Sequence, residues 1–140
     1  MSERIKLGTA LPFTDVGGAP ETVAVFAQAA EALGYDMRRG RLDTAVHPFE
    51  ISMTRNDVRI TSRWNPNYLP MSIFGTIHEA GHALYEMGAA PALTRGAHTT
   101  DMIGLYAVAG TSFGTHESQS RLLENHIGRT LAFWTVHYGR

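Results

Sequence analysis

Apolar residues recur at helical spacing in three stretches of the chain, a pattern that predicts a mainly helical fold. The first helix is expected over residues 21–33, because Pro20 stands before it and Gly34 follows it, the usual residues at a helix start and stop. A second helix is expected over residues 70–87, where a proline suits the first turn and Gly88 the stop. These two helices would frame the middle of the chain.

The third helix is expected to start near residue 115 and to run toward residue 138. Its predicted core stripe consists of Leu122, Leu123, Ile127, Leu131 and Trp134. Residues 89–114 carry several glycines and only a weak helical pattern, so they receive no regular element.

Strand-like residues occupy the segment between Val46 and Trp64. Apolar and β-branched residues flank the turn-like Arg55-Asn56-Asp57, which predicts a short β-hairpin ahead of the second helix. Residues 1–20 are polar, punctuated by glycine and proline, and read as a loosely structured lead-in. A chain of 140 residues is too short for two domains, so a single domain is expected.

The overall composition narrows the classes of partner and metal site. The formal net charge is −1, so the basic excess that nucleic acids or anionic membranes require is absent. With no cysteine in the chain, any metal must be held by histidines and carboxylates. The N-terminal segment has no continuous apolar stretch typical of a signal peptide, which favours a soluble cytoplasmic protein.

The clearest chemical signal is His78-Glu79-Ala80-Gly81-His82 on the second predicted helix. Histidines four residues apart lie on one helical face, so His78 and His82 can bind one zinc ion. Glu79 leaves the helix at a different angle and can face a zinc-activated water, where it would act as general acid and base in peptide hydrolysis.

A catalytic zinc usually has three protein ligands, and the residues leave the third one open. Glu117 and Glu124 are both candidates, because residues seven apart lie on the same face of the third predicted helix. Glu86 is interpreted as a solvated glutamate in a last turn. Spacing alone does not decide between Glu117 and Glu124.

Four short segments, in order, resemble the carboxypeptidase Taq (M32) family of metallocarboxypeptidases. They are His47-Pro48-Phe49 (the HPF motif), Asp57-Val58-Arg59-Ile60-Thr61 (DxRxT), the HExxH segment continued to Glu86, and His116-Glu117-Ser118-Gln119 (HESQ) continued to Leu122. The resemblance covers roughly residues 26–135. It implies a gluzincin-like helical core with the small hairpin beside the active site.

The resemblance also implies roles for individual residues. Glu117 becomes the third zinc ligand, and Glu79 the general acid and base. The HPF and DxRxT motifs are associated with the substrate groove, which makes His47, Asp57, Arg59 and Thr61 candidate substrate-binding residues. Two structural alternatives stay open: Arg59 forms a salt bridge with Asp57 across the hairpin, and His47 shapes the wall of the groove.

The function implied is zinc-dependent removal of C-terminal residues from peptides, with cobalt as an alternative metal and a homodimer as the expected assembly. The chain departs from the family in two ways. Residues 89–110 look like an insertion, and a later family motif, GxxQDxHW, is missing. Residues 21–140 are therefore expected to be the family-like part of a fragment of a larger helical catalytic domain. The alternative is a zinc-binding but catalytically incomplete fragment.

Overall fold

The computed structural model describes residues 20–65, 67–93 and 113–137. Its α-helices are α1 (Pro20–Ala32), α2 (Leu69–Gly88), α3 (Phe113–Arg121) and α4 (Leu131–His137), with a short 3₁₀ turn, η1 (Pro91–Leu93), and a π-helix, η2 (Leu122–Gly128). The strands are β1 (Gly40–Thr44), β2 (Glu50–Thr54) and β3 (Asp57–Ser62). The predicted mainly helical fold with a small β element is confirmed.

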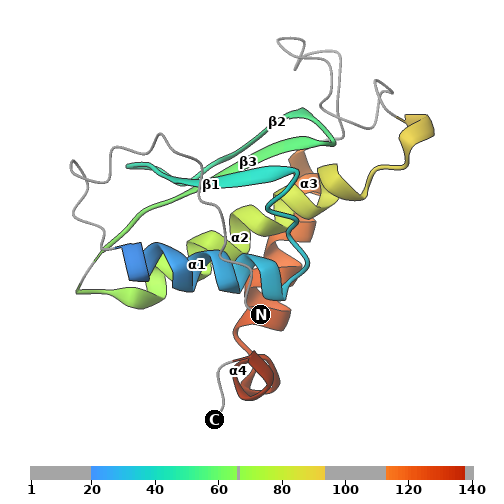
Figure 1. The fold of residues 1–140 in the computed structure, drawn as a ribbon. Coiled ribbons are helices and arrows are strands. Elements are labelled where there is room, and N and C mark those ends of the chain that lie inside the picture. Colours follow the sequence, from blue (N-terminus) through green and yellow to red (C-terminus); the bar gives the residue numbers. More distant parts are fainter. Residues whose placement is uncertain (1–19, 66, 94–112, 138–140) are drawn as a thin grey trace, which may run out of the picture.

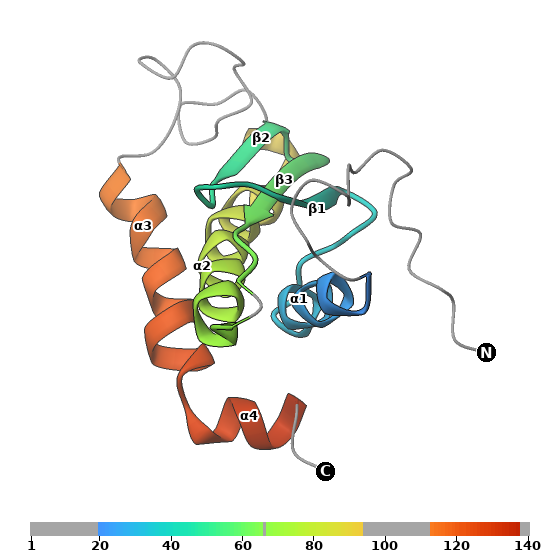
Figure 2. The same cartoon turned by 90° about the vertical axis from the view of Figure 1, so that its left-hand side faces the viewer.

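Helix α2 lies at the centre of the described structure. Figure 2 shows α2 between α1 on one side and α3 on the other, with the three-stranded sheet packed over α2. In Figure 1 the sheet runs above α1 and α2, and α4 lies farthest from it. Because α2 contacts every neighbouring layer, a side chain on almost any of its faces meets another element.

The sheet has the order β1-β3-β2, and only part of it was predicted. Strands β2 and β3 form the expected antiparallel hairpin around Asn56, with Thr54 opposite Asp57. Strand β1 pairs in parallel with β3, and it carries too few apolar residues to be recognised as a strand in the sequence. Val58 and Ile60 of β3 are fully buried, so the alternation of side chains puts Arg59 on the opposite face.

The core lies between the sheet and the helices. Its central side chains are Ile73, Ile77, Ala80, Ala83 and Met87 of α2, which meet small and aromatic residues of α1 and the inner face of the sheet. A buried polar cluster joins the end of β3 to α2, because Thr76 Oγ1 lies 2.8 Å from Ser62 Oγ and Ser62 Oγ donates to the Ser72 carbonyl oxygen at 3.1 Å. These contacts fix the start of α2 under the sheet.

The prediction of one continuous third helix is wrong. The chain forms α3, then the π-helix η2, and breaks around Arg129 before α4 begins. A π-helix closes its hydrogen bonds over five residues instead of four, so it rotates the side chains that follow out of the α-helical register. Much of the predicted core stripe is exposed, with Leu131 81% and Leu122 44% exposed, whereas Phe133 is the buried residue of α4.

One predicted helix end is wrong, and two predicted segments lie largely outside the described residues. Gly88 is the last residue of α2, and Ala89 caps the helix in an extended conformation, so the expected glycine stop is wrong. Residues 1–19 of the predicted lead-in and residues 94–110 of the predicted insertion lie outside the described residues. Among the residues that the structure describes, no helix combines the length and apolar character needed to cross a bilayer.

Candidate metal centre

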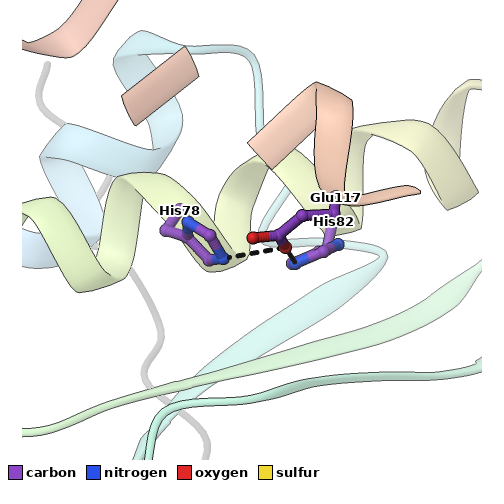
Figure 3. Close-up of side chains that lie close together, drawn as sticks. All are labelled: His78, His82 and Glu117. Atoms are coloured by element: carbon purple, nitrogen blue, oxygen red, sulfur yellow. Dashed lines mark ion pairs between the residues drawn. The ribbon is translucent and has the colours of Figure 1, made fainter. Parts of the chain in front are cut away.

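Three potential metal ligands converge between α2 and α3. His78 and His82 project from one face of α2, and their Nε2 atoms lie 3.3 Å and 3.1 Å from the same oxygen, Oε2 of Glu117 on α3. Figure 3 shows this carboxylate reaching from α3 between the two rings. These residues are the one candidate metal-binding group of its kind within the described ranges, and their ligand atoms lie within 4.8 Å of one another.

The spacing of these atoms fits a catalytic zinc site. Zinc binds histidine nitrogen and carboxylate oxygen at about 2.0–2.2 Å in a tetrahedron, so two of its ligand atoms lie roughly 3.3 Å apart. The two measured nitrogen–oxygen distances are close to that value. Two histidines and one glutamate also form a donor set used by catalytic zinc, with a fourth position left for water or substrate.

Gly81 allows α3 to approach α2 closely enough for this convergence. A Cβ atom added at Gly81 would collide with the backbone of Ser120 and of Gln119. Gly81 stands directly before His82, and Ser120 is three residues after Glu117. The missing side chain therefore sets the helix separation at the place where the ligands meet.

Neighbouring side chains hold Glu117 in its ionised form. Arg121 Nε donates to Glu117 Oε1 at 2.8 Å, and the Ser120 hydroxyl lies 3.1 Å from Oε2. Burial alone would raise the pKa of Glu117, but the hydrogen bond from Ser120, the neighbouring His78 and the bond from Arg121 together keep this pKa below its usual value. An ionised carboxylate is the form that binds a metal ion.

Glu124 contacts the same histidine through a different ring nitrogen. Its Oε2 lies 3.0 Å from Nδ1 of His78, and Arg129 donates to its Oε1 at 2.6 Å. Burial tends to raise the pKa of Glu124, but the bonds from Arg129 and His78 lower it overall. The two ring nitrogens of His78 therefore face different carboxylates, Nε2 that of Glu117 and Nδ1 that of Glu124.

Glu79 and His82 have protonation states suited to a metal site. Burial, with His116 and His78 nearby, lowers the pKa of His82 to about 4, so its ring is neutral at physiological pH. Glu79 is 8% exposed, and burial raises its pKa to about 7, against the lowering influence of His78. A carboxyl group with a pKa near neutrality can both accept and release a proton.

A second series of contacts involves Nδ1 of His82. Nδ1 of His116 hydrogen-bonds with Nδ1 of His82, and Nε2 of His116 lies 2.8 Å from Oε1 of Glu86. The rings of His116 and His82 are stacked, with centroids 4.7 Å apart. Glu86 is fully buried, so its interpretation as a solvated glutamate is wrong.

The predicted substrate-binding residues are not part of this cluster. Arg59 forms a two-pronged ion pair with Asp57 at 2.7 Å and 2.8 Å, within one strand and on the sheet face away from α2. Thr61 is buried and holds the backbone of Phe49, since the Phe49 N–H donates to Thr61 Oγ1 at 2.9 Å. His47 is exposed in the connection between β1 and β2. Their role in substrate binding stays a prediction.

Several residues that support the candidate ligands had no partner predicted from the sequence. Glu86 follows His82 by four residues and so shares its face of α2, and His116 adjoins Glu117, a pattern that could have suggested their contact. Arg121 follows Glu117 at the same helical spacing. Glu124 was considered only as a ligand, because a helix pattern does not tell which ring nitrogen a carboxylate will meet.

Several known proteins are similar to this chain over most of its length. A family model described as carboxypeptidase Taq (M32) metallopeptidase matches residues 17–140. Carboxypeptidase 1 of Bacillus subtilis is 47% identical over 108 residues, and thermostable carboxypeptidase 1 of Thermus thermophilus is 47% identical over 109 residues. These matches cover 77% and 78% of this chain and 20% of each relative.

A solved structure shares the fold of the described region. The crystal structure of an M32 carboxypeptidase from Deinococcus radiodurans R1 superposes with a TM-score of 0.72 at 40% sequence identity, covering 93% of this chain and 24% of that one. The present chain thus spans about a fifth of the length of the curated relatives that it matches.

Proposed function

Because the chain belongs to the carboxypeptidase Taq (M32) metallopeptidase family, we propose that it contributes the zinc site of a metallocarboxypeptidase that hydrolyses the C-terminal peptide bond of peptides. The observation that carries the proposal is the convergence of His78, His82 and Glu117 on one point, with the buried Glu79 on the same helix. Zinc is the proposed metal, with cobalt as an alternative, because the ligands are two imidazoles and one carboxylate.

In this proposal His78, His82 and Glu117 hold the ion. A bound zinc ion supplies Lewis-acid activation of water and of the substrate carbonyl. Glu79 takes a proton from the attacking water as the oxygen–carbon bond forms. It then passes the proton to the amine nitrogen as the carbon–nitrogen bond breaks. The raised pKa of Glu79 supports both transfers, since a group with a pKa near the working pH does each with little energetic cost.

The substrate side of the proposal rests on the HPF and DxRxT motifs. Pro48 lies beside Gly75 of α2, one turn before His78, and Thr61 anchors the adjacent backbone of Phe49. A peptide approaching the metal ligands would thus pass near this segment. We propose His47, Asp57, Arg59 and Thr61 as residues that bind substrate or limit the groove, and a homodimer as the assembly of the complete protein.

A second candidate is a metal-binding module without turnover. This candidate is favoured because the region matched by this chain covers only 18% to 20% of the length of the curated carboxypeptidases. The described residues also expose large apolar side chains, among them Leu131, Val136 and Val46.

Elemental analysis of the tag-free chain, followed by a C-terminal peptidase assay, separates these possibilities. Close to one zinc per chain, with amino-acid release that is lost in Glu79→Gln, is the expected result. Glu79→Gln should retain its zinc, because Glu79 is not a proposed ligand. One zinc without release would favour the module without turnover. Absence of zinc binding after incubation with the metal would overturn both candidates.

A further inference from the structure

Arg129, the residue that caps the π-helix η2, contacts three side chains at once. Its Nη2 donates to Oε1 of Glu124 at 2.6 Å, and its Nε donates to Oδ1 of Asn125 at 3.1 Å. Its guanidinium carbon lies 4.0 Å from the centre of the Phe74 ring on α2, within the range of a cation–π contact. Although the side chain of Arg129 is 47% exposed, it is thus held at three points.

The π-helical register brings Arg129 to Glu124. The two residues are five positions apart, whereas neighbours on the surface of an α-helix are three or four positions apart. A π-helix closes its hydrogen bonds over five residues, so side chains at that spacing lie near one another. Gly128 lets this end of η2 approach α2, because an added Cβ atom would lie 3.0 Å from Cδ1 of Ile77. Ile77 directly precedes His78.

The contacts of Arg129 begin and end on α2. Phe74 and His78 are four residues apart on that helix and so lie on one face of it. Oε1 of Glu124 faces Arg129, while Oε2 of Glu124 lies 3.0 Å from Nδ1 of His78. The Phe74 ring also contacts Trp134 of α4, with the centroids 6.2 Å apart and the rings nearly perpendicular. The contacts therefore leave α2 at Phe74, pass through η2 and return to α2 at His78.

We propose that Arg129 is a positioning residue that acts on His78 through Glu124. The ring of Phe74 and the π-helical register aim Arg129 at Glu124. Glu124 then keeps the ring of His78 turned so that its Nε2 points toward Glu117. The inference rests on the proposed metal site, but the contacts that carry it exist without the ion. Outer partners that orient a metal-binding histidine commonly change metal affinity by about 10-fold to 100-fold.

Proton NMR of the zinc-free chain tests the geometry without the metal. The side-chain protons of Arg129 next to the guanidinium should be shifted upfield by the Phe74 ring, and a nuclear Overhauser contact should join the γ-protons of Glu124 to Hε1 of His78. We expect that contact to be lost in Arg129→Gln. In Phe74→Leu, which keeps an apolar side chain but removes the aromatic face, both signals should be lost. An intact Glu124–His78 contact in either variant would overturn the proposal.

Zinc affinity, measured by competition with a chromogenic chelator, tests the consequence for the metal site. Arg129→Gln should raise the zinc dissociation constant about 10-fold, the lower end of the usual range, because Arg129 acts one contact farther from the metal than Glu124. The double variant of Arg129→Gln and Glu124→Ala should bind zinc no more weakly than Glu124→Ala alone. An unchanged dissociation constant in Arg129→Gln, or a further loss in the double variant, would show that Arg129 does not act through Glu124.

A surface arginine provides the matched control. Arg38→Gln makes the same change at an exposed guanidinium that pairs with Asp36 in the connection between α1 and β1, and it should leave zinc affinity unchanged. An equal loss in Arg38→Gln and Arg129→Gln would reduce the effect to general charge and overturn the proposal. Zinc stoichiometry of the parent chain tests the proposed function separately. The NMR contacts decide the positioning of Glu124 whether or not zinc binds, so the two failures are distinguishable.

Discussion

Charged side chains form pairs in two regions of the molecule, and the two regions differ in how far apart the paired residues lie in the sequence. On the outer face of the sheet, Arg41 pairs with Asp43 and Arg59 with Asp57, each within a single strand and with the side chains 21–43% exposed. Between α2 and α3, the partners come from elements far apart in sequence, and Glu86 is fully buried.

The difference has an energetic meaning. An exposed pair two residues apart on one strand forms whenever that strand forms, and such a pair contributes about 0–1 kcal/mol. Between α2 and α3, Glu117 contacts both His78 and His82, and Glu86 is fully buried. Removing one of these groups therefore costs more than one contact, or leaves a buried group less well satisfied. The outer pairs should therefore tolerate substitution one by one, whereas the groups of the metal centre should respond together.

Replacing the third ligand should have the largest effect. Glu117→Ala removes the oxygen that lies within 3.3 Å of both histidine Nε2 atoms, and we expect the zinc dissociation constant to rise more than about 100-fold. Glu124→Ala, the matched control, removes only an orienting partner and should weaken binding by about 10-fold to 100-fold. Competition with a chromogenic chelator measures both. The reverse ranking would make Glu124 the ligand.

Separating the two helices should be the next most damaging change. Gly81→Ala drives a methyl group into the backbone of Ser120, which cannot move like a flexible side chain, so we expect a loss of about 2–3 kcal/mol and weaker zinc binding. In Gly88→Ala, at the end of the same helix, the methyl group meets nothing within 4 Å, and stability should stay or rise slightly. Urea unfolding measures both variants; equal stabilities would refute the close-approach argument.

A partly buried carboxylate near the metal centre should make stability depend on pH. Burial raises the pKa of Glu50 on β2 from 4.5 to about 7, against the hydrogen bond from Ser52. Between these values the folded chain keeps a proton that the unfolded chain releases, so this contribution is complete below 4.5 and is lost as pH rises through 7. Glu50→Gln stays neutral, and its free energy of unfolding relative to the parent chain should rise by about 2–3 kcal/mol between about pH 5 and about pH 8.

Urea titrations of the zinc-free chain at about pH 5 and about pH 8 check this, since the two values bracket most of the transition of Glu50. Glu31→Gln is the matched control for the same change at the surface. A gain of Glu50→Gln that is larger at low pH than at high pH would show that Glu50 is ionised in the folded chain.

The sequence predicts those parts of the fold that depend on local pattern. Residues 21–33 and 70–87 have clear helical spacing with suitable ends, and the structure confirms α1 and α2 within one or two residues. The hairpin around Asn56 is confirmed for the same reason. Strand β1 was missed because its pairing with β3 is parallel and distant in sequence, and four of its five residues are only half-buried.

The π-helix is the main local feature that the sequence pattern did not predict. Nothing in the composition of Leu122–Gly128 distinguishes it from an α-helix, and beyond it Leu131 is exposed and Phe133 is buried. At the candidate metal centre, spacing singled out His78, Glu79 and His82, since they share one helix. It could not rank Glu117 above Glu124 or pair Glu86 with His116, because those contacts depend on how α3 crosses α2 at Gly81.

The smallest effect on stability is expected on the outer face of the sheet, where it also tests the substrate proposal. Arg59→Ala removes an exposed pair, so the free energy of unfolding should fall by less than about 1 kcal/mol. Arg41→Ala is a matched control, because Arg41 lies in register with Arg59 and pairs with Asp43 in the same way. If Arg59 binds the substrate carboxylate, peptidase assays should show a raised KM for Arg59→Ala alone. Equal KM values would leave Arg59 as the partner of Asp57, and a large loss of stability would mean that the two regions of the molecule do not differ as argued.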